Sequence, residues 1–204
     1  MSLPFTDWCP ALGNEPGAEA GIFGEALEYG RARGWRFFET RGGSAGTPSS
    51  TPSVAFYGHD IDLTGGEERM FTALDSSVRR GVRKASSSPL RVETTTSPEA
   101  MREYYHLHCR TRRRHGAPPQ PFRFFDAITR HVLAANHGEI FAARIHGRMA
   151  AGAIFFRHGA SVIYKFGASD VESQEHRPNN LILWEAMRQF ARADAGCCTL
   201  DAPL

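Results

Sequence analysis

The stretch Ser161-Val-Ile-Tyr-Lys-Phe-Gly-Ala-Ser-Asp170, followed shortly by Pro178-Asn-Asn-Leu-Ile-Leu-Trp-Glu-Ala-Met187, decides the fold. Its first part is rich in β-branched and aromatic residues and predicts a strand over residues 161–167. Its second part predicts a helix, because proline favours the first helical position and Ile182, Ala186 and Phe190 recur at helical spacing. A strand followed by an amphipathic helix is therefore the centre of the expected fold.

Two further β-like runs precede this centre, at residues 140–145 and 149–157. Short connections at His146-Gly147 and His158-Gly159 join the three runs, and two-residue connections that contain glycine favour antiparallel hairpins. We therefore expect a three-strand antiparallel meander.

Helices are expected upstream of the meander. Residues 67–86 predict one helix, although Gly81 weakens it by ~1 kcal/mol relative to alanine. A short strand at 90–94 leads to Ser97-Pro98-Glu99, which predicts a helix start through a capping hydroxyl, a first-turn proline and an early carboxylate. That helix should stop near Gly116, and another fits residues 122–135. With a last strand at 197–201, the order indicates an α+β fold with helices on a mostly antiparallel sheet.

The N-terminal part carries a helix–strand unit, with a helix over residues 18–34 and a strand over 35–40. Residues 42–53 are glycine, serine, threonine and proline with almost no large apolar side chain, so we expect a mobile loop that contributes nothing to a core.

Composition limits the class of protein. The 204 residues suit one domain with appended segments, and the formal charge of +2 gives no general affinity for DNA. The four cysteines show no C-x-x-C spacing, which favours a reducing compartment, and we expect a cytoplasmic protein. No apolar run approaches the ~18 residues of a membrane span, and no signal peptide is evident.

Three strings carry a resemblance to a known family. Ser76-Ser-Val-Arg-Arg-Gly-Val-Arg-Lys-Ala85 resembles the R-x-x-x-R-K-A helix of the Fem (FemAB-like) family in the GNAT acyltransferase superfamily. The two stretches quoted first resemble that family's Y-x-x-G-A-S-D strand end and P-N-x-L-x-x-W-E-A-I helix start. The likeness covers roughly residues 60–204 and implies a GNAT-like fold.

The resemblance also implies a domain organisation. Fem proteins carry two GNAT-like domains in tandem, and Glu39-Thr-Arg-Gly-Gly43 fits the end of the first. We therefore expect residues 1–57 to be the remnant of a first domain plus a loop, and residues 58–204 to be a Fem-type domain. Leu200-Asp-Ala-Pro-Leu204 stands where the family has D-F-G and then F-K-x-G-F, so we expect this domain to be incomplete at its C-terminus, which leaves open whether the chain alone is active.

The implied activity is transfer of an acyl or aminoacyl group to an amine of a cell-wall or exopolysaccharide precursor. The donor would be aminoacyl-tRNA or acyl-CoA, and no cofactor would be bound permanently. Acetyl-CoA-using relatives have a glycine-containing loop where this chain has Ser173-Gln-Glu-His-Arg-Pro178. Two alternatives are a catalytically silent GNAT-like domain that binds a partner or polysaccharide intermediate, and an acetyl-CoA-dependent N-acetyltransferase. The oligomeric state stays open.

Candidate site residues follow from the chemistry of acyl transfer, which needs an oxyanion donor and a route for the departing proton. Tyr164, Lys165 and Glu185 are the candidate catalytic residues, with ordinary packing, exposure or helix-dipole roles as the alternatives. Two basic clusters, at 79–84 and 110–115, could bind phosphates. The alternative is that they only lie in solvent at a helix end, where the helix dipole favours positive charge. The candidate substrate contacts are Arg79, Arg80, Arg83, Lys84, Arg112, Arg114, Ser169, Asn179 and Asn180. No metal site is expected, since His106 and His108 point in different directions on a helix.

Overall fold

The computed structural model describes residues 11, 15, 18–41, 58–193 and 196–200. The chain divides into two compact units, Met1–Tyr57 and Gly58–Leu204. Each unit is described by itself. The prediction that the first unit is the remnant of a GNAT-like domain stays a prediction.

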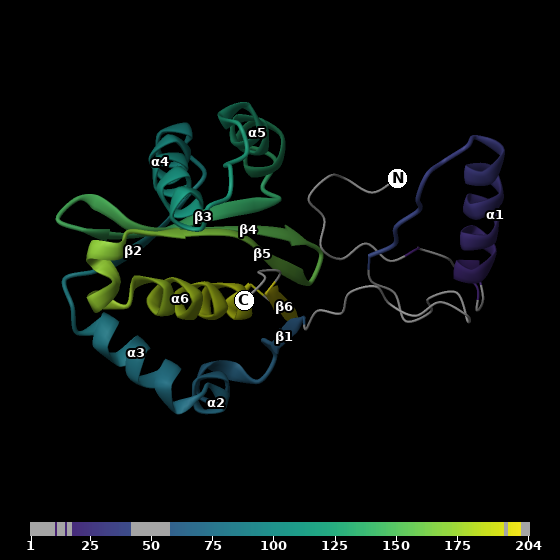
Figure 1. The fold of residues 1–204 in the computed structure, drawn as a ribbon. Helices are drawn as coiled ribbons and strands as arrows, with labels where there is room; N and C mark the ends of the chain where they lie inside the picture. The colour runs from purple at the N-terminus through teal and green to yellow at the C-terminus, as the bar shows by residue number, and fades with distance from the viewer. Residues whose placement is uncertain (1–10, 12–14, 16–17, 42–57, 194–195, 201–204) are drawn as a thin grey trace. The chain divides into compact units, whose positions relative to one another are not determined.

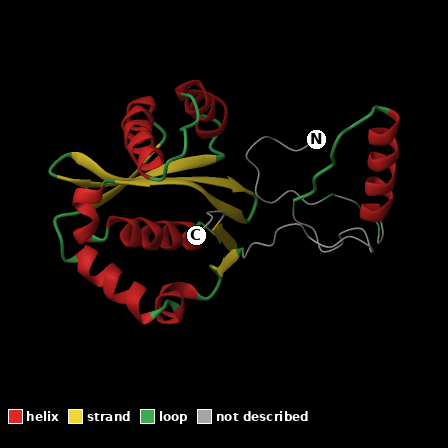
Figure 2. Ribbon diagram, viewed as in Figure 1, coloured by secondary structure: helices red, strands yellow, loops and turns green. Residues whose placement is uncertain are grey.

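The larger unit is built on a six-stranded sheet in the order β1-β6-β5-β4-β3-β2 (Figure 2). Its strands are β1 His59–Asp62, β2 Arg91–Thr95, β3 Gly138–Ile145, β4 Arg148–His158, β5 Ser161–Ser169 and β6 Cys197–Leu200. Four of the five pairings are antiparallel, and β5 with β6 is parallel. The α+β class with a mostly antiparallel sheet is therefore confirmed.

Helices cover both faces of this sheet, as Figure 1 shows. One face carries α4 Pro98–Arg114 and α5 Phe122–Ile128, and the other carries α6 Pro178–Arg192. Beyond α6 lie α2 Gly66–Ala73 and α3 Ser76–Ser86, which run from β1 towards β2. A short 3-10 helix, Val171–His176, joins β5 to α6. None of the helices among the described residues combines the length and apolar character that crossing a bilayer requires.

Each face of the sheet has its own hydrophobic core. Tyr104, Phe125 and Ile154 are fully buried under α4 and α5. Phe141, Phe155 and Phe190 pack together between the sheet and α6, with ring centroids 5.1 to 5.6 Å apart. Strand β4 contributes to both cores, so it is buried on both faces.

The local signals for α4 and for the meander are confirmed. The Ser97 hydroxyl accepts a hydrogen bond from the Ala100 N–H at 3.1 Å, and Pro98 occupies the first turn. The hairpins turn at Gly147 and Gly159, whose φ values of 78° and 56° are costly for other residues.

Three expectations about elements are wrong. The single helix over 67–86 is two helices, because Leu74 is extended and the Asp75 carboxylate caps α3 through the Ser77 N–H. The helix over 122–135 is α5 followed by a π-helical turn, Thr129–Leu133. Residues 35–40 form no strand. The loop expected at 42–53 and residue 201 of the expected last strand lie outside the described residues.

In the smaller unit, α1 spans Ala18–Ala32. The chain after it folds back on the helix, since Trp35 contacts Tyr29 with ring centroids 5.6 Å apart. An added Cβ at Gly30 would lie 2.5 Å from the Trp35 ring, so only glycine allows this approach. Trp35 and Phe38 thus pack against aromatic side chains of α1 and against each other instead of joining a sheet.

Candidate functional site

The candidate site lies along β5, beyond the last residue that pairs with the described part of β6. Their parallel pairing runs from Ser161 with Cys197 to Tyr164 with Leu200, whereas β5 continues to Ser169. Among the described residues, no strand pairs with the β6 side of residues 165–169. Within the described residues, the backbone N–H and C=O groups on that edge have no ladder partner, and we call this edge the opening.

A β-bulge decides which side chains face this opening. Phe155 pairs with Tyr164 and Ile154 pairs with Phe166, which leaves Lys165 as the extra residue. Tyr164 consequently lies on the α6 face, where its ring contacts Phe155 at 5.3 Å, and Phe166 lies on the α5 face, where it contacts Phe125 at 5.4 Å. Lys165 is half-buried at the bulge.

The Tyr164 hydroxyl lies directly against Gly167. A Cβ built at Gly167 would be 1.8 Å from the hydroxyl oxygen, so no other residue fits there with Tyr164 in this position. Among the described residues, no group forms a hydrogen bond with this hydroxyl. Burial raises the pKa of Tyr164, so the phenol is protonated at neutral pH and can donate a proton or hydrogen bond.

The N-terminus of α6 lies beside the end of β5. The Asn179 side-chain amide donates to the Ser169 hydroxyl at 3.3 Å. The first residue before the helix, Arg177, has a left-handed conformation and provides no side-chain cap. Backbone N–H groups at this helix end are therefore available for an anionic group.

Asn180 lies against α3. A Cβ added to Gly81 would be 2.9 Å from the Asn180 amide nitrogen, so the missing side chain at Gly81 makes room for this amide. Ser169 and Asn179, which the sequence identified separately, are thus in contact at the end of β5, and Asn180 lies next to them in sequence against α3.

The basic cluster on α3 is mostly engaged elsewhere. The Arg79 guanidinium donates to the carbonyls of Thr72 and Leu74, which closes the α2–α3 corner. The other three candidates have different surroundings: Arg80 contacts Ser76 at 3.4 Å, Arg83 lies over the Phe71 ring at 5.5 Å, and Lys84 is exposed. No contact of these side chains involves β5.

The basic end of α4 lies closer to the opening. Arg110 donates to both carboxylate oxygens of Asp170, at 3.0 and 3.2 Å, and so ties α4 to the end of β5. Arg112 is half-buried and donates to the Pro118 carbonyl at 3.4 Å, while Arg114 is exposed. This cluster can bind an anionic part of a substrate that extends out of the opening.

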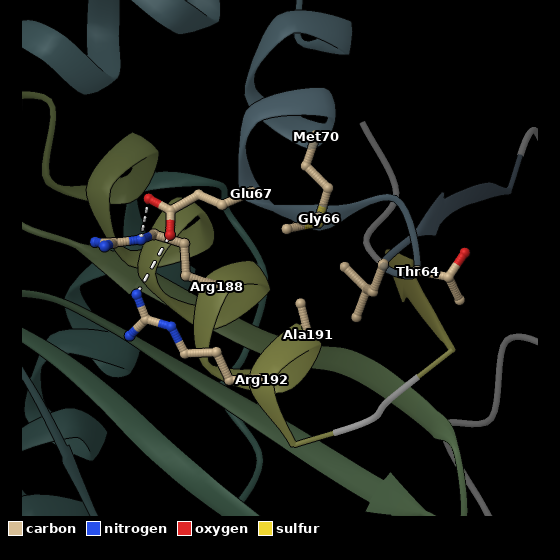
Figure 3. Close-up of a pocket in the computed structure, with 8 residues that line it drawn as sticks. Thr64, Gly66, Glu67, Met70, Arg188, Ala191 and Arg192 are labelled. Carbon is tan, nitrogen blue, oxygen red and sulfur yellow. Dashed lines mark hydrogen bonds and ion pairs between the residues drawn. The ribbon is translucent and has the colours of Figure 1, made fainter.

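Glu185 is held in an ion-pair network on another side of α6. Its carboxylate accepts two hydrogen bonds from Arg188, at 3.0 and 3.1 Å. Arg188 and Arg192 in turn pair with Glu67 at 2.8 and 3.3 Å, around a cavity of about 360 Å³ (Figure 3). The structure therefore does not bring Glu185 together with Tyr164.

Two glycines were missed as site residues. The signal was present, because an isolated glycine inside a strand or helix often marks a close approach. However, the groups that these glycines make room for could not be predicted. Gly81 makes room for Asn180, which is remote in sequence, and Gly167 makes room for Tyr164, whose position depends on a bulge. No group of three or more histidine, cysteine or acidic side chains among the described residues could hold a metal ion.

Comparisons with known proteins agree with this fold. The family model described as "Acetyltransferase (GNAT) domain" matches residues 74–202. No curated protein matches. The fold is similar to the crystal structure of FemX, with a TM-score of 0.64 and 14% identity, covering 69% of this chain and 51% of that one.

A second similar structure is the C-terminal domain (DUF2156) of a putative lysylphosphatidylglycerol synthetase from Agrobacterium fabrum. Its TM-score is 0.51 at 14% identity, with coverage of 69% of this chain and 44% of that one. L-PGS from Bacillus licheniformis gives 0.50 at 9%, covering 70% and 43%. The chain thus spans about half the length of the structures that it matches.

Proposed function

This chain belongs to the acetyltransferase (GNAT) domain family, and from that membership we propose that it is a Fem-type transferase. It would move an acyl or aminoacyl group onto an amine of a cell-wall or exopolysaccharide precursor. The fold similarity to FemX and to the synthetase domains supports an aminoacyl donor. Residues 58–204 would form the transferase domain.

The open edge of β5 beside Tyr164 carries this proposal. A donor inserted between β5 and β6 would place its carbonyl against backbone N–H groups on that edge, which then stabilise the oxyanion. Ser169 and Asn179 lie at the same end of β5 and supply hydrogen-bonding groups for substrate. All these groups come from regular elements, so they are held in place before substrate binds.

The reaction follows from these positions. The neutral acceptor amine attacks the carbonyl carbon, and the oxyanion forms against the β5 edge. When the oxyanion collapses, the bond to the donor's leaving oxygen or sulfur breaks, and the amine releases its proton to solvent. Tyr164, kept protonated by its raised pKa, donates its proton to the leaving atom and is reprotonated from solvent.

Phosphates of the donor would lie at two places near this opening. The uncapped N-terminus of α6 suits one phosphate, with Asn180 at its edge. Arg112 and Arg114 suit further phosphates of a tRNA or of a nucleotide-linked precursor. Lys165 contributes positive charge at the bulge.

An acetyl-CoA-dependent N-acetyltransferase is the second candidate. The uncapped N-terminus of α6 favours it, because a pyrophosphate could bind there without the glycine loop that residues 173–177 lack. The two candidates share the opening and differ in the donor.

Donor binding and transfer can be measured together. We expect charged tRNA to raise the melting temperature of the protein and to support transfer to a precursor amine, and acetyl-CoA to do neither. Tyr164→Phe should lower kcat about 100-fold, since general acid catalysis contributes roughly 10²–10⁴. Tyr105→Phe is the control, because its hydroxyl donates to the Gln120 carbonyl on the other face of the sheet.

The outcomes separate the candidates. Transfer from acetyl-CoA alone would make the chain an N-acetyltransferase. Binding of a precursor without transfer from either donor would support the silent binding domain. Full activity of Tyr164→Phe would remove this tyrosine from the reaction.

A further inference from the structure

A second concave site lies away from β5, between α2, α3 and α6. Its volume is about 780 Å³, within the range of small-molecule sites. Phe71, Val82 and Trp184 form its apolar floor, Glu67 and Glu68 line it from α2, and Arg83 lines it from α3. We call this site the strap groove.

The floor suits an apolar body of modest size. Val82 and Trp184 are almost fully buried, and the Phe71 ring meets Trp184 edge to face with centroids 5.0 Å apart. Phe71 is only partly buried, so most of the apolar area that a ligand can cover belongs to its ring, and covering it is favourable. The floor supplies no hydrogen bonds. Ser86 and Ser87 also line the groove, but their hydroxyls donate to backbone carbonyls within α3, so the charged side chains are the main groups that can orient a ligand.

Arg83 is prepared to bind a planar anion. Its guanidinium lies over Phe71, 5.5 Å from the ring centroid, and it has no ion pair or hydrogen bond to any described residue. An arginine that stacks on an aromatic ring keeps its N–H edges free for a bidentate contact with a carboxylate. The α3 side of the groove therefore suits a carboxylate.

The α2 side has the opposite preference. Glu67 is neutralised by Arg188 and Arg192, at 2.8 and 3.3 Å. The carboxylate of Glu68 has no such partner among the described residues. Because Glu68 faces the same groove as Arg83, it attracts a cation and repels a dianion such as phosphate. A ligand that satisfies both sides carries an ammonium and a carboxylate.

We propose that the strap groove binds a zwitterionic amino acid or short peptide, with its carboxylate on Arg83, its ammonium on Glu68 and its apolar part on Phe71 and Trp184. Binding here does not depend on acyl transfer at β5, so the proposal goes beyond the proposed function. A neutral sugar would leave both charges unpaired, and a nucleotide would place phosphates beside the carboxylates.

Calorimetry on the full chain tests the charge requirement directly. The probes are leucyl-leucine, its N-acetyl derivative, its C-terminal amide and inorganic phosphate. We expect the free dipeptide to bind and each capped form to bind at least fivefold more weakly, because each cap removes one charge-assisted contact. Phosphate should not compete. These comparisons use the unaltered protein and do not rely on any variant folding.

Two variants then assign each charge to its side chain. Arg83→Gln should weaken binding of the free dipeptide at least fivefold but leave binding of the C-terminal amide unchanged. Glu68→Gln should also weaken binding of the free dipeptide at least fivefold, but it should leave binding of the N-acetyl form unchanged. Arg123→Gln and Glu99→Gln, exposed and outside the groove, should bind like the unaltered chain. Equal binding of capped and free dipeptides, stronger binding of phosphate, or no binding of any probe would each overturn the proposal.

Discussion

At the scale of single residues, His108 is the clearest pH-sensitive group of the fold. It is 4% exposed, and its Nε2 lies 2.9 Å from the Gln120 side-chain oxygen, while its Nδ1 is buried without a hydrogen-bond partner. Burial lowers the pKa of His108, against a smaller opposing effect of Gln120. The imidazole is therefore neutral in the folded protein at neutral pH.

The sign of the resulting pH dependence follows. The unfolded chain takes up a proton near pH 6.5, whereas the folded chain takes it up only at lower pH. Stability should therefore fall as the pH drops from about 6.5 through the folded pKa. Thermal unfolding between pH 7 and 5 measures this, and His108→Asn should show a flatter slope. An equal slope in the variant would assign the effect to other groups.

Glu103 gives a pH dependence in a lower window. Burial alone would raise its pKa, but hydrogen bonds from Arg144 at 3.0 Å and from the Met149 N–H at 2.9 Å, with the Arg144 charge, lower it overall. Its stabilisation is thus full above the unfolded pKa of about 4.5 and lost as pH falls through the folded value.

Replacing this carboxylate should therefore matter only above that window. We expect Glu103→Gln to cost about 1 kcal/mol at pH 7, discounted for partial exposure, and the difference from the unaltered chain to shrink towards pH 3. Glu99→Gln, which removes an exposed pair with Arg102, should cost almost nothing at either pH. Urea unfolding at the two pH values provides the measurement. A difference that persists at pH 3 would show that packing, and not charge, is the cause.

At the scale of elements, the contact between α3 and α6 overrides helix propensity. Replacing a glycine inside a helix by alanine usually stabilises the helix by about 1 kcal/mol. A Cβ at Gly81, however, would press on the Asn180 amide at 2.9 Å. We expect Gly81→Ala to be no more stable than the unaltered chain, and Gly24→Ala in α1, where the space is open, to stabilise its own helix. A rise in melting temperature for Gly81→Ala would show that Asn180 moves freely.

The same scale explains what the sequence could and could not predict. The meander and α4 follow from local signals, namely glycine turns and the Ser97 cap. The break between α2 and α3 was missed because the apolar period continues through Leu74. The break depends on Asp75 and on Arg79, whose guanidinium reaches back to the carbonyl of Thr72. The position of Tyr164 likewise depends on a bulge that the strand pattern does not reveal.

At the scale of the whole molecule, the two units should be separable. Every residue of the two hydrophobic cores, and every partly buried residue packed on them, lies between Ile61 and Cys198. We expect a chain of residues 58–204 to unfold cooperatively, with a melting temperature within about 3 °C of the full chain, a shift of less than roughly 1 kcal/mol. A larger loss would show that residues 1–57 stabilise the second unit.

The pairing of β1 with β6 has a consequence for biosynthesis. His59 pairs with Leu200 and Asp62 pairs with Cys197, so β1, which is made first, cannot pair until β6 has been made. While the ribosome makes the intervening residues, β3 and β4 can pair at once with their neighbours, but β1 has no partner strand. The edge that flanks the donor opening is therefore the last part of the described sheet to form, and a nascent chain cannot complete that edge until β6 has left the exit tunnel.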